Sequence, residues 1–297
     1  MPLTDEQIAI RATGIGASEL AAALGLSPWC TPLELFQRKR GELSPPEETR
    51  PMRFGNFAEQ FILDEFQLAH PDLPLVRAPN TLRRGPLLAH LDAWVPDVCN
   101  VQAKTARTRA GWGDSGSNSV PEYYLIQVQA EMLLANVHVS YMPVFFGGSE
   151  YDEFVVEADW ELQEMIEDGA HSFWRRVQEG EPPEPVSYAD VQARWGSKST
   201  ANAVTADEQA LSAITALREL TALSKELDDK IEFRRAIVMK HLGENDTLID
   251  ASGKVLATWK AAKPSLRFDS KTFQLEHADI YDQYLKPSDV SRRFLIK

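Results

Sequence analysis

The spacing of apolar and polar residues divides the chain into segments of two kinds. Apolar residues return every three or four positions where the sequence predicts amphipathic helices, at 18–25, 31–41, 52–70, 121–136 and 159–180. Period-two alternation predicts strands in the intervening segments, at 87–95, 100–106, 139–148 and 150–157. Because helices alternate with strand pairs, the predicted fold class is α/β, with a central mixed sheet flanked by helices.

The pattern changes after the last of these helices. Segment 181–205 is rich in Pro, Gly and Ser and is predicted to be a linker. Leu and Ile then recur at helical spacing, which predicts one long helix over 206–242 that ends at Gly243. A hairpin that turns at Ser252–Gly253, a helix at 269–285 and a final strand at 292–297 follow. The predicted domains are a core at 1–180, the linker, and a mainly helical extension with a small hairpin at 206–297.

Length and composition are those of a globular protein. A chain of 297 residues with 43% hydrophobic and 25% charged residues can bury a full core. No run approaches the length of a membrane span, and the N-terminus lacks the pattern of a signal peptide, so we expect a cytoplasmic protein with no membrane partner. Cys30 and Cys99 lie far apart in the sequence and lack CxxC spacing, which argues against a zinc or iron–sulfur site.

The net charge of −13 excludes a surface that binds nucleic acid everywhere. The charge is unevenly distributed, since residues 247–297 contain nine Lys and Arg against six Asp and Glu. A local basic lining is compatible with this balance, and so is an ordinary mixed surface.

Polar side chains on the strands predicted at 87–95 and 100–106 form the main candidate site. Period-two alternation places Asp92 on one face of the first strand, and Gln102 and Lys104 on one face of the second. If the strands pair as a hairpin, the three side chains converge. The alternative is an edge strand whose polar face meets water.

Two helices carry further polar residues at apolar positions. Glu59 has Ile62 and Phe66 as helical neighbours, so its carboxylate points inward and requires a cation. Gln127 lies on the half-polar side of its helix, which can border a cleft, and Gln129 lies on the buried side. A core salt bridge for the glutamate, and hydrogen bonds to the backbone for either glutamine, are the alternatives.

Oxygen ligands of this kind suit Mg²⁺, which binds one or two carboxylates together with waters and phosphate oxygens. Asp92 and an acid at position 102 supply such a set, with the carbonyl of Ala103 and the carboxylate of Glu59 as further ligands. Lys104 on the same face can orient and deprotonate an attacking water, or offset charge in the transition state.

A second candidate site lies near the N-terminus. Ser18 begins a predicted helix after the segment TGIGA, where free backbone N–H groups attract anions. Arg11 can add a bidentate contact to phosphate. The alternative is a plain helix-capping serine.

Five stretches taken together resemble the lambda exonuclease and YqaJ-type viral recombinase family of the PD-(D/E)xK nuclease superfamily. They are RATGIGASELAAALGLSPWCTPLELF, FGNFAEQF, LLAHLDAWV, VQAKTA and YLIQVQAEM, in the family's order and spacing between residues 11 and 136. The resemblance implies a PD-(D/E)xK (restriction-endonuclease-like) core and 5′→3′ digestion of double-stranded DNA from its ends, which leaves single strands for an annealing protein. It also implies two Mg²⁺ ions, with Mn²⁺ as a substitute, a homotrimer, and a phage or prophage protein in a bacterial host.

The resemblance also assigns roles to the candidate residues. The family's supporting glutamine corresponds to Gln127, with Gln129 as the fallback. Arg11 and Ser18 correspond to the pair that binds the 5′-phosphate of the DNA end.

The metal site contains the one departure from the family pattern. The family's ligands correspond to Glu59, Asp92 and residue 102, and its lysine to Lys104, but residue 102 is Gln. An amide keeps the shape of glutamate and one oxygen donor but removes a negative charge beside the metals. We therefore expect strongly reduced or absent cleavage with DNA binding retained, and the near-isosteric change favours a deliberate inactivating substitution over a natural one.

Two other functions remain open. One is a non-catalytic DNA-end-binding or recombination-assembly protein on the same fold, and the other is a related endonuclease. Outside the metal site, the Gly- and Ser-rich loop 107–120 supplies Arg107, Arg109 and Trp112 as candidates for DNA contact. Trp112 is expected to stack on an unpaired base, and its replacement by Ala is expected to leave the fold intact.

Overall fold

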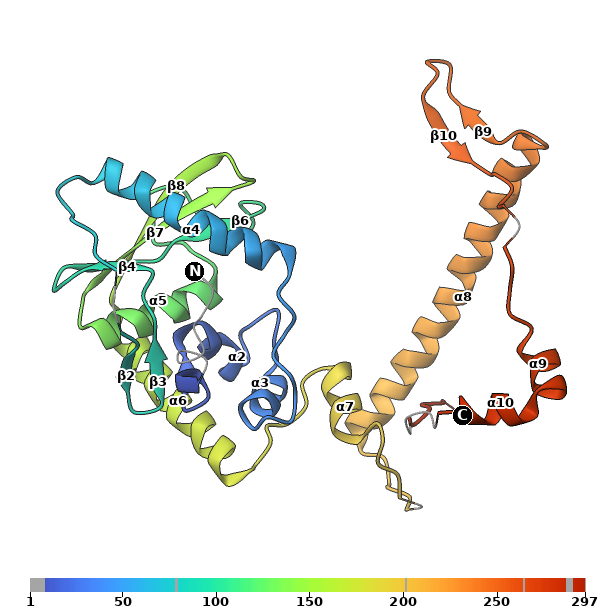
Figure 1. Ribbon diagram of the computed structural model, residues 1–297, viewed down its shortest axis with the longest axis horizontal. Coiled ribbons are helices and arrows are strands. Elements are labelled where there is room, and N and C mark those ends of the chain that lie inside the picture. Colours follow the sequence, from blue (N-terminus) through green and yellow to red (C-terminus); the bar gives the residue numbers. More distant parts are fainter. Residues whose placement is uncertain (1–8, 78–79, 201, 264, 287–290, 297) are drawn as a thin grey trace. The chain divides into compact units, whose positions relative to one another are not determined.

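The computed structural model describes residues 9–77, 80–200, 202–263, 265–286 and 291–296. The chain forms two compact units, Met1–Arg194 and Trp195–Lys297, called here the first and second unit (Figure 1). Within the described ranges, no helix is both long enough and apolar enough to cross a membrane.

A five-stranded mixed sheet forms the centre of the first unit. Its strands are β4 (Ala93–Val95), β5 (Cys99–Val101), β6 (Lys104–Ala106), β7 (Val139–Phe146) and β8 (Glu150–Glu157). Strand β8 pairs with β7 in antiparallel fashion, and both β5 and β6 pair with β7 in parallel. Since Val101 is paired with Tyr141 and Lys104 with Val144, β5 and β6 continue one another along β7 without a change of register. The strand predicted at 100–106 is therefore present but interrupted at Gln102–Ala103.

The strand predicted at 87–95 is two strands in two sheets. Its first part, β3 (Leu87–Ala89), lies between β1 (Ile15–Gly16) and β2 (Leu82–Arg84) in a three-stranded sheet. Its second part, β4, pairs with β5. Leu88 is as buried as its neighbours Leu87 and Ala89, and a strand buried on both faces does not alternate. The prediction of one continuous alternating strand is therefore wrong, and the break falls at His90–Asp92.

Helices cover both faces of the five-stranded sheet (Figure 1). On one face, α4 (Arg50–Ala69) packs Ile62 and Phe66 against Cys99 and Val101. On the other, α5 (Glu122–Ala135) packs Val128 and Met132 against Met142 and Val144 of β7. The predicted α/β class with a helix-flanked mixed sheet is confirmed.

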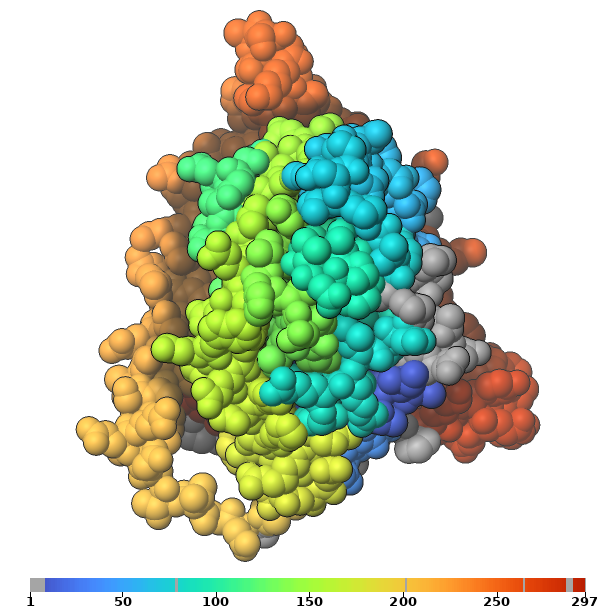
Figure 2. All heavy atoms as spheres, turned by 90° about the vertical axis from the view of Figure 1, so that its left-hand side faces the viewer, coloured from blue at the N-terminus to red at the C-terminus, as the bar shows by residue number. Residues whose placement is uncertain are grey.

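Further helices of the first unit are η1 (Ala17–Glu19), α2 (Leu20–Ala23), α3 (Pro32–Lys39) and α6 (Trp160–Glu179). Thr31 and Asp159 begin α3 and α6, because their side-chain oxygens accept the N–H groups of Glu34 and Leu162. Figure 2 shows that α4 and the chain after it (light blue to teal) share one face with β7, β8 and α6 (green to yellow-green).

The segment predicted to be a linker contains a helix, α7 (Tyr188–Trp195). Asp190 on this helix is 4% exposed. Its carboxylate accepts the N–H groups of Val186 and Ser187 and, at 2.6 Å, the hydroxyl of Thr31. These bonds attach α7 to the start of α3, so the first unit extends beyond residue 180.

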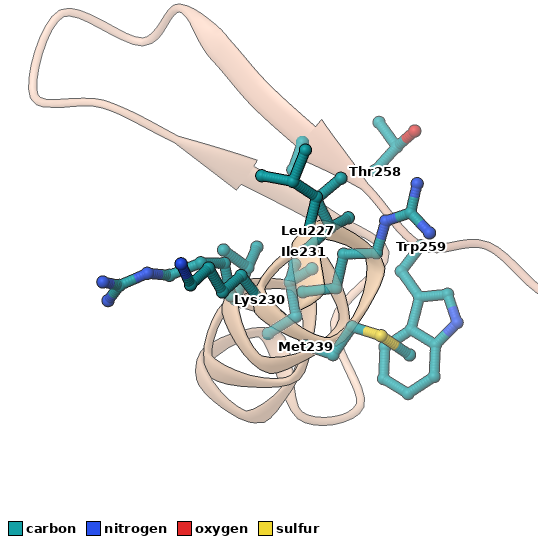
Figure 3. A pocket seen from close by; sticks show the side chains of 11 residues that line it. Leu227, Lys230, Ile231, Met239, Thr258 and Trp259 are labelled. Carbon is teal, nitrogen blue, oxygen red and sulfur yellow. The ribbon is translucent and has the colours of Figure 1, made fainter. Parts of the chain in front are cut away.

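The second unit, which begins at Trp195, contains α8 (Glu208–Leu242), the long helix of 35 residues that the sequence predicts. A hairpin of β9 (Thr247–Ile249) and β10 (Val255–Thr258) follows, then α9 (Ser270–Glu276) and α10 (Ala278–Gln283). The helix predicted at 269–285 is thus broken at His277, and the described residues 291–296 do not form the predicted strand. An open groove between α8 and β10 is lined by Leu227, Ile231, Met239 and Trp259, among others (Figure 3).

Candidate active site

Asp92 lies just before β4 and Gln102 just after β5, so the two residues meet at the open end of this hairpin. Ala93 is paired with Val101, so the next positions along the two strands lie opposite one another. Asp92 Oδ2 accepts a hydrogen bond from Gln102 Nε2 at 2.6 Å and one from the backbone N–H of Ala103 at 3.0 Å. The hairpin thus brings the acid and the amide into contact, and the role of the Ala103 carbonyl stays a prediction.

A second set of side chains links the sheet to α5. Lys104 Nζ lies 4.8 Å from the ring centre of Tyr124 and donates to Gln127 Oε1 at 3.1 Å. Gln127 Nε2 donates to Glu131 Oε1 at 2.7 Å, and Asn100 Nδ2 donates to Glu131 Oε2 at 3.1 Å. A continuous chain of hydrogen bonds therefore runs from Lys104 to Asn100 through the buried carboxyl group of Glu131.

Sequence reasoning missed Glu131. The sequence signal was available, because Glu131 follows Gln127 by four positions on a helix that is otherwise apolar around it. A carboxylate at such a position requires polar partners. Gln127 is such a partner by its helical spacing, whereas Asn100 becomes one only because β5 packs beneath α5.

Glu59 lies at the edge of this cluster and is paired with Arg77. Their closest atoms, Glu59 Oε1 and Arg77 Nη1, are 2.6 Å apart, and the same Nη1 donates to the backbone carbonyl of Asp92 at 2.7 Å. Arg77 is the cation that the position of Glu59 required, and it connects α4 to the hairpin.

Two buried acids in this cluster have raised pKa values. Burial raises the pKa of Asp92 to about 6, Lys104 acts against this shift, and Glu59 adds to it. Burial raises the pKa of Glu131 to about 8, again against the influence of Lys104, while Asp92 adds to the shift. The surrounding groups therefore stabilise the ionised forms of both acids less than water does, which is typical of functional sites.

Several buried polar atoms near these acids have no hydrogen-bond partner in the described part of the chain. They are Trp94 Nε1, Asn100 Oδ1, Gln102 Oε1 and Ser140 Oγ. Trp94, Asn100 and Ser140 occupy adjacent positions on β4, β5 and β7, so their side chains share one face of the sheet. Because unsatisfied buried polar groups are rare, this row marks a place where a water or an ion belongs.

The donor set suits a divalent cation that is completed by its substrate. No three His, Cys, Asp or Glu side chains form a ready-made metal cage within the residues described. Mg²⁺ does not need one, because it retains waters and binds one or two carboxylates together with phosphate oxygens. Asp92 and the unpaired amide oxygen of Gln102 provide ligands of this kind on the hairpin.

The structure also brings Arg11 and Ser18 together, with Arg11 Nη2 donating to Ser18 Oγ at 2.9 Å. Ser18 lies in the 3-10 turn η1, whose N-cap is Gly16 and which continues into α2, so the helical segment begins one residue before the predicted position. Burial lowers the pKa of His90, Glu59 counteracts that shift, and Arg11 adds to it. Arg11 therefore lies within electrostatic range of the segment that carries Asp92.

Gln129 lies outside the cluster. Its Nε2 donates to the backbone carbonyl of Glu157 at 2.7 Å. Its Oε1 accepts the N–H of Asp159 and the side-chain amide of Gln163, both at 3.0 Å. Gln129 therefore joins α5 to the start of α6, and the fallback assignment of the supporting glutamine to this residue is not supported by its position.

The loop after β6 differs from expectation. Trp112 is half-buried, and its ring centre lies 4.9 Å from that of Phe154 and 5.5 Å from that of Phe146. Arg109 forms ion pairs with Asp152 and Glu150, and Arg107 is exposed. Trp112 packs against the core, which sequence reasoning did not expect, and its contact with DNA stays a prediction.

The fold of the first unit is similar to that of a solved structure. A mixed sheet flanked by α4 and α5 is the PD-(D/E)xK fold of exonucleases, and here Asp92 precedes β4, residue 102 follows β5 and Lys104 begins β6. A solved structure with this fold, an alkaline exonuclease from Laribacter hongkongensis, superimposes with a TM-score of 0.50 at 15% identity and covers 60% of this chain and 94% of that chain.

Comparison of the sequences adds two further similarities. Residues 7–138 match the YqaJ-like viral recombinase domain. The chain is 27% identical to the uncharacterized protein YqaJ of Bacillus subtilis (strain 168) over 99% of its own length and 94% of that protein. The predicted resemblance to the YqaJ and lambda exonuclease family is therefore confirmed, and the similarity to the Bacillus protein includes the second unit.

Proposed function

We propose that this protein is a metal-dependent deoxyribonuclease that digests double-stranded DNA from its ends. The observation that carries the proposal is the contact between Asp92 and Gln102 beside Lys104, within the fold of phage-type exonucleases. The family match and the likeness to an alkaline exonuclease support this assignment.

The residues of the site would have different roles in metal binding and in contact with the phosphate. Asp92 and the oxygen of Gln102 would hold Mg²⁺ or Mn²⁺, two ions in the active form, with Glu59 and the Ala103 carbonyl as further ligands. Bound metal of this kind polarises the phosphate and lowers the pKa of a coordinated water. Lys104, oriented by Gln127, presents a positive charge to the phosphate or the water.

The DNA end requires a separate binding site. Arg11 and Ser18 are in contact with one another, and a guanidinium beside a hydroxyl can bind a terminal phosphate. Exposed Arg107 is a further candidate for contact with the DNA backbone. Digestion in the 5′→3′ direction, delivery of the single strand to an annealing protein, and a homotrimer are proposals that rest on the family resemblance alone.

Gln102 determines how strongly the hairpin binds metal. It leaves Asp92 as the acid in contact with position 102, and one carboxylate holds two divalent ions weakly. Strongly reduced cleavage follows if no other acid takes part. In that case the protein would bind DNA ends without digesting them, which is the second candidate function.

The test is a digestion assay on three DNA substrates in Mg²⁺ and in EDTA. We expect loss of nucleotides from a 5′-phosphorylated linear duplex, slower loss from a 5′-hydroxyl duplex, and no change in a covalently closed circle. Asp92→Asn and Lys104→Ala should each reduce the rate by at least 100-fold. Glu122→Gln, an exposed position on α5, is the matched control and should be unchanged. Nicking of the circle would indicate an endonuclease instead.

A further inference from the structure

Glu131 is the acid of this cluster to which sequence reasoning assigns no role. It is 1% exposed and projects from α5 toward the face of the sheet that carries Asn100. Both of its hydrogen-bond partners, Gln127 and Asn100, are neutral amides. Asp92 is held in the same way, by the amide groups of Gln102 and Ala103. A carboxyl group so deeply buried without a charged hydrogen-bond partner is costly unless it serves a purpose.

We infer that Glu131 supplies the second carboxylate of the metal site, in place of the acid absent at position 102. The inference rests on the proposed nuclease function and deepens it. Asp92 from the hairpin and Glu131 from α5 would bind the divalent cation, and Gln102 would add a neutral oxygen. Gln102 is then a natural residue of a working site and not an inactivating substitution.

Two buried amide oxygens that have no donor among the described residues support this placement. Gln102 Oε1 and Asn100 Oδ1 are acceptors without donors, on residues that are 4% and 0% exposed. Position 100 precedes position 102 by two residues along one edge of β7, so the two amides point to the same face. Asn100 also binds Glu131 directly. The two neutral oxygens, which have no donor among the described residues, would therefore be available to a cation bound by the two acids.

The charges of the cluster lead to the same conclusion. Lys104 acts on both Asp92 and Glu131, while Glu59 is neutralised by Arg77. With both acids ionised, the cluster as described has a net charge of −1. A divalent cation changes this to +1, which one DNA phosphate neutralises. If Asp92 were the only acid, the same cation would leave an excess of +2 within a buried site.

The experiment measures binding of Mn²⁺ to the full chain without DNA, by electron paramagnetic resonance. Glu131→Gln keeps the shape of the side chain, and we expect it to weaken Mn²⁺ binding by at least tenfold. Glu122→Gln makes the same chemical change at an exposed position of the same helix and should bind as the parent does. Binding of Glu131→Gln within twofold of the parent would overturn the inference.

A double variant distinguishes whether Glu131 binds the metal or only supports the fold. Gln102→Glu combined with Glu131→Gln returns the acid to the strand, and we expect it to recover Mn²⁺ binding to the parent level. Failure to recover would mean that Glu131 supports the fold and is not a ligand. In the digestion assay the parent should be active and Glu131→Gln at least 100-fold slower. An inactive parent whose Mn²⁺ binding still depends on Glu131 would reject the nuclease function while leaving this site in place.

Discussion

At the scale of single residues, three side chains have roles that their sequence neighbours do not reveal. Arg77 neutralises Glu59 and donates to the Asp92 backbone, although it lies outside the five stretches that carry the family resemblance. Gln127 and Gln129 are two positions apart, yet one orients Lys104 and the other joins α5 to α6. Residues two apart on a helix lie on different faces, so a QxQ motif serves two separate purposes.

Trp112→Ala tests the position of this side chain. Trp112 packs against Phe154, Phe146 and Tyr124, so its removal should lower the free energy of unfolding by about 2 kcal/mol, since it is only half-buried. Urea denaturation followed by circular dichroism measures the change. Trp160→Ala is the control, because that ring is 62% exposed and its loss should cost less than about 0.5 kcal/mol. Equal stability of the two variants would contradict the packing.

Arg77→Ala tests the link between α4 and the hairpin. Without Arg77, Glu59 loses its ion pair and the Asp92 carbonyl loses a donor, so we expect a loss of about 1–3 kcal/mol in the free energy of unfolding. Urea denaturation followed by circular dichroism measures this loss. Removing both partners, in Arg77→Ala with Glu59→Gln, should cost less than removing Arg77 alone, because the negative charge that Arg77 neutralises is then removed as well. An additive loss would mean that the two side chains act independently.

At the scale of elements, the candidate site lies where two of the predicted strands are interrupted. The strands predicted at 87–95 and 100–106 break at His90–Asp92 and at Gln102–Ala103, which are the positions of the candidate ligands. Each break releases backbone groups from the ladder, and the Ala103 N–H then donates to Asp92. Hydrophobic alternation could predict the two strands and their pairing. It could not predict the breaks, because these depend on which sheet each half joins.

Helix α7 gives a pH-dependent prediction. Burial by itself raises the pKa of Asp190, but hydrogen bonds from Thr31, Val186 and Ser187 outweigh it and leave that pKa below its usual value of 3.8. A lowered pKa contributes stability above the unfolded-state value that is lost as the pH falls below it. Asp190→Asn should therefore lower the free energy of unfolding by about 1 kcal/mol at neutral pH. The difference should shrink below pH 3.8.

Urea unfolding of the parent and of Asp190→Asn, at neutral pH and below pH 3.8, measures this difference in the free energy of unfolding. Asp168→Asn on α6, where the side chain is exposed, provides the comparison. A destabilisation of Asp190→Asn that does not change with pH would show that the charge of Asp190 contributes nothing.

At the scale of the whole molecule, the apolar core lies in the first unit. Its three clusters of buried hydrophobic residues contain nothing beyond Val177 among the described residues. In the second unit, Leu220 and Leu223 of α8 are 61% and 51% exposed, and Leu242 is the one buried hydrophobic residue among those that the structure describes there. The stability of the protein is therefore expected to reside mainly in residues 1–194.

Truncation after Arg194 tests this division. We expect residues 1–194 to unfold cooperatively with a Tm within about 4 °C of the corresponding transition in the full chain, because its core is complete. Differential scanning calorimetry of both proteins measures the transitions. Loss of the cooperative transition would show that the second unit contributes to the core. Mass measurement of the two proteins in solution would also test the proposed trimer.

The sequence by itself determined the local structure of this protein and the family to which it is similar. The repeat of apolar residues and the capping groups Thr31 and Asp159 specify helices through contacts within a few residues. The same local pattern brought Asp92, Gln102 and Lys104 into consideration. Only the tertiary structure decided which acid accompanies Asp92, because Glu131 meets Asn100 across 31 positions of sequence. Periodicity shows which face of an element is buried, whereas the packing of one element on another decides what that face meets.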